Sequence, residues 1–146
     1  MTIDEVIAKQ NGKPRSRPRD EEHKLQCVCV NWFRYQHREL FLHLWAVPNG
    51  GARSKATAGK LKAEGVVAGV ADLVLTVPNA KHHALFIEMK TRTGRQSEAQ
   101  KKWQQAQEAK GYKYVVCRSV EDFIEAIEDY LNDGCDAIAP YGTIED

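Results

Sequence analysis

Two short apolar segments in the middle of the chain carry acidic side chains, and the second also carries a lysine. Asp72 precedes Leu73-Val74-Leu75, while Glu88 and Lys90 lie within the apolar segment 84–90. If that segment is a strand, Glu88 and Lys90 project from one face, because successive side chains alternate. Such charged groups are costly to bury unless they are paired or bind something. Carboxylates suit Mg²⁺ or Mn²⁺, so we expect Asp72 and Glu88 to hold a divalent metal ion beside Lys90.

The strands that carry these groups must lie side by side within a larger fold. Apolar residues alternate or recur at helical spacing along the chain, and turn-forming residues interrupt them. The resulting order, α-β-α-β-β-α-β-α, predicts an α/β (α+β mixed) fold with a central mixed sheet flanked by helices. We expect helices over 20–41, 52–64, 97–110 and 119–132, and strands over 42–47, 72–77, 84–90 and 112–117.

Three polar side chains near helix starts have simple structural explanations. Ser97 followed by Gln100 is typical of a capping box, in which each side chain bonds the other residue's backbone N–H. Glu22 lies in the first turn of its expected helix, where acidic residues complement the helix dipole. Gln26 follows one turn after Glu22 and shares its face. From spacing alone, none of these residues requires a catalytic role.

Basic side chains flank the central strands in the sequence. They include Arg53, Lys55, Lys60, Arg92 and Arg95. The first three belong to the second expected helix, and the last two follow the lysine-bearing strand. They could form an edge that contacts DNA phosphates, or they could simply be a solvated surface. The sequence leaves both interpretations open.

The net charge of +1 hides a segregation of charge along the chain. Residues 1–118 carry all 21 Lys and Arg against 11 Asp and Glu, a net of +10. Residues 119–146 carry nine Asp and Glu and no Lys or Arg, a net of −9. This pattern favours a polyanion-binding protein whose C-terminal part faces away from its ligand. The alternative is that the acidic end is only a solvated helix face and tail.

The length of 146 residues predicts one domain with a core of its own. We expect a flexible basic arm over 1–19, which either adds phosphate contacts or is idle, a folded domain over 20–132, and an acidic tail over 133–146. The sequence has no apolar run long enough to span a membrane and no recognisable signal peptide. Its four cysteines lack the paired spacing of a zinc site. We therefore expect a cytoplasmic protein, in a bacterium or a virus-infected host, with reduced thiols and no membrane partner.

The ordered set of residues resembles the PD-(D/E)xK nuclease superfamily and, within it, the VRR-Nuc family. The superfamily pattern is an acidic residue on one strand and Glu-x-Lys on the next, here Asp72 and Glu88-Met89-Lys90. Further matches are Gly69-Val70-Ala71-Asp72-Leu73, with Ala71 where proline is usual, Ser97-Glu98-Ala99-Gln100, Glu22 with Gln26, and Val47-Pro48-Asn49. The resemblance covers nearly the whole chain, and the full ordered set is far more specific than Glu-x-Lys alone.

The resemblance implies a restriction-endonuclease-like core and a metal-dependent phosphodiester hydrolase. By this resemblance the catalytic residues are Asp72, Glu88, Lys90, Gln100 and Glu22. The metal ligands are Asp72, Glu88, the backbone carbonyl of Met89 and Glu22. Small standalone members of the family are similar in length and are associated with homodimers that cut four-way (Holliday) junctions. The resemblance thus implies a homodimeric, structure-selective DNA endonuclease of DNA repair or recombination.

Other functions are compatible with the same residues. A general or nicking DNase on duplex DNA would use the same metal site. A non-catalytic DNA-binding module would use only the basic face, although it would have no need of the acidic cluster. A structural fold could also bury Glu88 and Lys90 as an ion pair without any metal. Cleavage assays on different DNA structures separate these possibilities.

Overall fold

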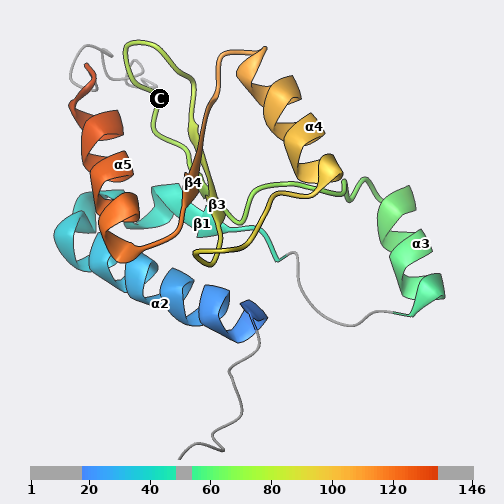
Figure 1. Cartoon of the computed structure of the whole chain (residues 1–146). Coiled ribbons are helices and arrows are strands. Elements are labelled where there is room, and N and C mark those ends of the chain that lie inside the picture. Colours follow the sequence, from blue (N-terminus) through green and yellow to red (C-terminus); the bar gives the residue numbers. More distant parts are fainter. Residues whose placement is uncertain (1–17, 49–53, 135–146) are drawn as a thin grey trace, which may run out of the picture.

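The computed structural model of the protein describes residues 18–48 and 54–134 (Figure 1). The expected basic arm lies outside the described residues up to residue 17, and the acidic tail lies outside them from residue 135. Arg53, one of the expected DNA-binding residues, also lies outside them. Among the helices of the described ranges, none is long and apolar enough to cross a membrane.

The described elements follow the order expected from the sequence, with one additional 3₁₀ helix. They are α2 (Pro18–Gln36), η1 (Arg38–His43), β1 (Leu44–Ala46), α3 (Lys55–Ala63), β2 (Leu73–Leu75), β3 (Leu85–Met89), α4 (Glu98–Glu108), β4 (Lys113–Cys117) and α5 (Val120–Asn132). The strands form one sheet in the order β1-β2-β3-β4. The first two pairings are antiparallel, whereas β3 and β4 run parallel. The mixed sheet flanked by helices is confirmed.

The first expected helix, over 20–41, is wrong at its C-terminal end. Helix α2 stops at Gln36, and His37 leaves the helical region with φ −124° and ψ 61°. Its ring packs against Trp32 and Phe33, with centroid separations of 5.7 and 5.2 Å. These contacts fix the turn after which η1 leads into β1. The strand therefore begins at Leu44 and not at residue 42.

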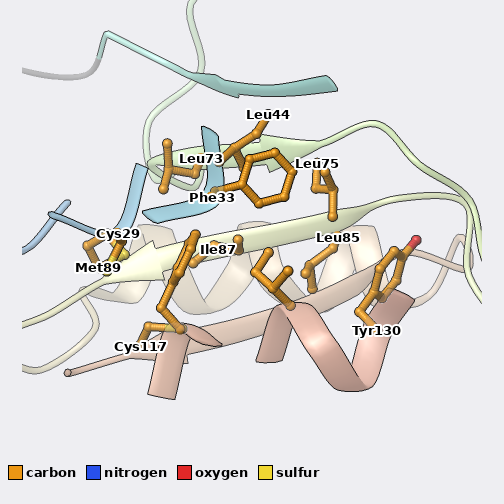
Figure 2. Packing of buried hydrophobic residues seen from close by; sticks show 12 residues of the cluster. Cys29, Phe33, Leu44, Leu73, Leu75, Leu85, Ile87, Met89, Cys117 and Tyr130 are labelled. Carbon is orange, nitrogen blue, oxygen red and sulfur yellow. The ribbon is translucent and has the colours of Figure 1, made fainter. Parts of the chain in front are cut away.

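The core lies between one face of the sheet and the pair of helices α2 and α5. Strand β3 turns Leu85, Ile87 and Met89 to this face, and all three are buried. Helix α2 adds Phe33, and α5 packs against both α2 and β4. Figure 2 shows these side chains meeting in one cluster that also includes Cys117. Burial of this face fixes the register of β3, because a shift of one residue would turn Glu88 into the core.

The opposite face of the sheet is covered by α4 (Figure 1). Phe86 on β3 contacts Trp103 of α4 edge to face, with ring centroids 4.8 Å apart. Trp103 also lies near Tyr114 of β4, at 6.1 Å. These aromatic contacts hold α4 over the side of β3 that carries Glu88 and Lys90.

Helix α3 stands at one side of the molecule, away from the sheet (Figure 1). None of its residues is buried. Ser54 caps its start, where the side-chain oxygen accepts a hydrogen bond from the backbone of Thr57 at 3.1 Å. The chain then returns to the body through residues 64–72 and enters β2. Helix α3 is thus an exposed projection that residues 64–72 connect to β2.

Candidate active site

The expected catalytic side chains all line one cleft of about 850 Å³. They are Glu22 from α2, Asp72 at the entry to β2, Glu88 and Lys90 from the end of β3, and Gln100 from α4. Residues 65–70 form a further wall of the cleft. Because these residues are far apart in sequence, their convergence is produced by the sheet order and by the placement of α4.

Glu88 is the most buried of these side chains, with an exposed fraction of 2%. Its Oε1 atom accepts a hydrogen bond from Gln100 Nε2 at 2.8 Å and lies 3.7 Å from Lys90 Nζ. Its Oε2 atom is buried and has no hydrogen-bond partner within the described ranges. A buried, unpartnered carboxylate oxygen is rare in proteins and calls for an explanation such as an ion.

The electrostatic surroundings of Glu88 disfavour its charged form. Burial and the nearby carboxylates of Asp72 and Glu22 raise the pKa of Glu88 to about 8, although Lys90 opposes the rise. Burial is the largest of these effects. A cation bound in the cleft would favour the ionised form of Glu88 and would offset the repulsion between its charge and the neighbouring carboxylates.

Asp72 joins the two central strands through its side chain. Its Oδ2 atom accepts a hydrogen bond from the backbone N–H of Met89 at 2.8 Å. The Met89 side chain points into the core on the other face. The bond holds the Asp72 carboxylate beside the backbone that leads from Glu88 to Lys90.

The donor set suits a hydrated hard cation more than a fully protein-ligated one. Among the residues that the structure describes, no three His, Cys, Asp or Glu side chains are arranged to hold a metal ion directly. Mg²⁺ usually keeps several waters and uses only one or two protein carboxylates. The free Oε2 of Glu88 and the carboxylate of Asp72 fit such a site.

Gln100 has both a structural role and a place in the cleft. It forms the expected capping box with Ser97, since Ser97 Oγ accepts from Gln100 N at 3.1 Å and Gln100 Oε1 accepts from Ser97 N at 2.9 Å. Its remaining amide group donates to Glu88. The cap therefore leaves Gln100 with one defined orientation, in which its amide nitrogen faces the carboxylate.

Gly69 allows the wall of the cleft to approach α4. Its φ of +86° lies in the region that favours glycine, and a Cβ atom there would lie 2.4 Å from the carbonyl oxygen of Ala99. That oxygen belongs to backbone, which cannot move aside cheaply. Glycine at this position thus permits residues 65–70 to pass the first turn of α4 and close the cleft beside Gln100.

The comparisons with known proteins identify the family. A model described as the VRR-NUC domain matches residues 9–121. The chain belongs to the VRR-NUC family. A solved structure named "VRR_NUC domain protein" matches with a TM-score of 0.68 and 29% sequence identity, over 77% of this chain and 89% of that chain. No curated protein matches the chain.

Membership of the VRR-NUC family implies a nuclease-type function in DNA processing. Ala71, at the position where the sequence resemblance places a proline, is fully buried. It directly precedes Asp72, whose carboxylate still reaches the Met89 backbone. The substitution leaves this hydrogen bond in place.

The structure places the expected DNA-binding residues at two exposed sites. Lys55 and Lys60 lie on α3, and Arg92 and Arg95 lie between β3 and α4. Arg53 lies outside the described residues. None of the four lines the cleft itself, whereas Lys62, one turn of α3 beyond Ala58, does. The sequence places Lys62 on the same basic helix, but helical spacing alone does not show which lysine of an exposed helix faces the cleft.

Two supporting residues were also missed. Arg118 donates from Nη1 to the carbonyl oxygens of Thr91 at 2.7 Å and Gly94 at 2.6 Å, and thereby braces the loop that follows Lys90. Tyr114 lies close to Glu88, and burial and that carboxylate raise its pKa. Its hydroxyl oxygen accepts from Gln96 at 3.2 Å. Both contacts join different elements, so no local pattern in the sequence could reveal them.

Proposed function

We propose that this VRR-NUC protein is a Mg²⁺- or Mn²⁺-dependent, structure-selective DNA endonuclease that acts on four-way junctions or other branched DNA. The observation that carries the proposal is the position of Glu88. It is buried at the base of a cleft with two further carboxylates, a lysine and a glutamine, and one of its oxygens has no partner among the described residues. A surface that only binds DNA has no use for a cluster of carboxyl groups, whose ionised forms repel phosphate.

Asp72 and Glu88 would hold the metal ion, with the Met89 carbonyl as a further ligand, and Glu22 would hold a water of the outer shell or help to hold a second ion. Such an ion supplies positive charge that activates a water and offsets the charge of the phosphate. Lys90, 3.7 Å from Glu88, is placed to orient the attacking water or to stabilise developing negative charge. Gln100 keeps Glu88 Oε1 occupied, whereas Glu88 Oε2 is buried and has no hydrogen-bond partner among the described residues, so a metal ion would supply the missing partner.

The DNA backbone would run across the basic residues on either side of the cleft. Lys55, Lys60 and Lys62 would contact phosphates on one side, and Arg92 and Arg95 on the other. Contacts of this kind set affinity and position without reading sequence. A homodimer with two-fold symmetry would present two such clefts to opposed strands, which suits paired cuts in a junction.

The test is a cleavage assay on end-labelled four-way junction, flap, linear duplex and single strand with Mg²⁺ or Mn²⁺. The variants are Glu88→Gln and Lys90→Met, each of which should lower the cleavage rate by roughly 10²–10³-fold while DNA binding and folding are retained. The matched controls are Glu98→Gln and Lys101→Met. This exposed pair on α4 has a similar separation of 3.4 Å, and its loss should leave cleavage unchanged.

The pattern of products separates the functional alternatives. Symmetric cuts confined to the junction, together with a dimer in sedimentation, support the proposal in full. Equal cutting of every substrate would make the protein a general or nicking DNase. Binding without cleavage by the wild-type protein would make it a non-catalytic module. Loss of folding in Glu88→Gln with no effect of metal would indicate a structural ion pair instead.

A further inference from the structure

Two valines stand exposed in the wall of the catalytic cleft. Val66 and Val67 have exposed fractions of 48% and 56%, and both line the cavity that contains Asp72 and Glu88. Valine methyl groups cannot hydrogen bond to phosphates, sugars or a hydrated metal ion. Their position therefore has no explanation in phosphodiester hydrolysis alone.

The segment that carries the valines is anchored at both ends. Helix α3 ends in a Schellman motif, in which Gly65 N donates to Lys62 O at 3.1 Å and Val66 N donates to Leu61 O at 3.0 Å. This motif often brings the residue at the position of Val66 against the residue at the position of Leu61, which accounts for part of Val66. Val67 lies beyond the motif. At the other end, Gly69 is held against the backbone of α4.

The helix that leads to the valines is basic. Helix α3 carries Lys55, Lys60 and Lys62 and has no acidic residue within its bounds, although Glu64 follows as its C-cap. Exposed apolar side chains next to a lysine match the surface of nucleic acid, in which apolar base faces lie between charged backbones. Lys62 lines the same cleft as Val66 and Val67, so this lysine and the valines would reach the same stretch of DNA.

The position of Val66 and Val67 in the cleft favours DNA over a second protein chain as their binding partner. A protein seated on Val66 and Val67 would cover the cleft that also holds Asp72 and Glu88. DNA must enter that cleft to be cut. The occupant that contacts the valines is therefore the substrate.

We propose that Val66 and Val67 form an apolar tip that packs against the exposed face of a base where stacking of the DNA is interrupted, as at a branch point. Apolar side chains inserted at base steps unstack and kink DNA at an energetic cost, and the cost is lowest where stacking is already open. Branched β-carbons keep the valines stiff, so binding costs them little conformational entropy. The inference rests on the proposed nuclease function and gives it a basis for selecting branched DNA.

The test compares Val67→Ser with Val28→Ser. Val28 is 52% exposed on α2 and does not line the cleft. The substrates are a four-way junction and a linear duplex of matched sequence, each with 2-aminopurine at the branch point or the equivalent position. Val67→Ser should lower the preference for cutting the junction over the duplex about tenfold. It should also abolish the rise in 2-aminopurine fluorescence on binding, which the wild type and Val28→Ser retain.

Two results would overturn the inference. One is an unchanged junction preference and fluorescence rise in Val67→Ser. The other is a sedimentation coefficient that falls in Val67→Ser while the fluorescence rise persists, which would assign the valines to contact with a second copy. The fluorescence measurement needs no cleavage. A wild-type protein that cuts no DNA would therefore refute the nuclease function, whereas a fluorescence rise that depends on Val67 would still support the tip.

Discussion

At the scale of single residues, the unusual feature is a glutamate that the folded protein keeps protonated. The folded state holds this proton up to a pKa of about 8, whereas the ordinary pKa of the side chain is 4.5. The folded state thus binds more protons than the unfolded chain between these values, so the free energy of unfolding falls as pH rises through this window. Above the window, the fold contains a buried negative charge that Lys90 offsets only in part.

We expect the metal-free wild-type protein to lose stability between about pH 5 and 8, by on the order of a few kcal/mol, since one pKa unit corresponds to about 1.4 kcal/mol. Glu88→Gln cannot titrate and should show a flatter profile. Urea unfolding in EDTA at several pH values measures the difference, and the contribution of the other titrating groups cancels in the comparison. Mn²⁺ added at pH 8 should restore stability to the wild type only. Parallel profiles for the two proteins would show that Glu88 is not the titrating group.

The placement of Glu88 beside Lys90 could be predicted because it is local to one strand. Alternation along a strand places Glu88 and Lys90 on one face, and the structure confirms it with the 3.7 Å separation. The hydrogen bond between Asp72 and the Met89 backbone could not be predicted, since it depends on how far β2 and β3 overlap. Lys62 could not be singled out, because helical spacing does not show which lysine of α3 faces the cleft, and Tyr114 and Arg118 were missed because their contacts join different elements.

At the scale of elements, the start of α4 links stability to the site. Ser97→Ala removes the side-chain oxygen that accepts from Gln100 N, and we expect a loss of about 1 kcal/mol in the free energy of unfolding. It should also lower the cleavage rate, because Gln100 loses half of the cap that orients it toward Glu88. Thermal unfolding and cleavage rates measure the two effects.

Ser119→Ala provides the matched control at the start of α5. Ser119 Oγ accepts from Asp122 N at 3.0 Å, so the substitution removes a hydrogen bond of the same kind. Its removal should cost similar stability with no change in the cleavage rate of the folded protein. Equal effects of both variants on cleavage would show that the cap acts only through stability.

The elements themselves could be predicted from periodicity, capping and turn residues. The capping box at Ser97 is one example, because both of its hydrogen bonds lie within four residues. The end of α2 was missed, since the chain leaves the helix at His37 without a Pro or Gly to mark the stop. Helix α2 ends there because the His37 ring packs on Trp32 and Phe33, and no local residue pattern indicates this packing.

At the scale of the whole molecule, charge is separated in space as well as in sequence. Helix α3 with its lysines lies on one side of the molecule, and α5 lies on the other (Figure 1). Helix α5 carries five exposed acidic side chains, namely Glu121, Asp122, Glu125, Glu128 and Asp129. The composition predicted a polyanion ligand but could not show that the acidic helix would be remote from the basic one.

We expect the salt dependence of DNA binding to come from the α3 side. Replacing Lys60 and Lys62 by glutamine should reduce the slope of log affinity against log salt by about 0.9 for each phosphate that the variant no longer neutralises. Replacing Glu125 and Glu128 of α5 by glutamine should leave the slope unchanged. Fluorescence anisotropy on a labelled duplex without metal gives both slopes. A slope that changes only for the α5 variant would place the DNA on the other side.

The opposite placement of α3 and α5 also has a consequence for encounter kinetics. A molecule with positive charge at one end and negative charge at the other is an electric dipole, and near a polyanion it experiences a torque as well as a force. The protein would therefore rotate before contact, with the α3 end leading and α5 trailing. A larger share of diffusional collisions would then bring the cleft to the DNA first, which raises the productive association rate without any added interaction in the bound complex.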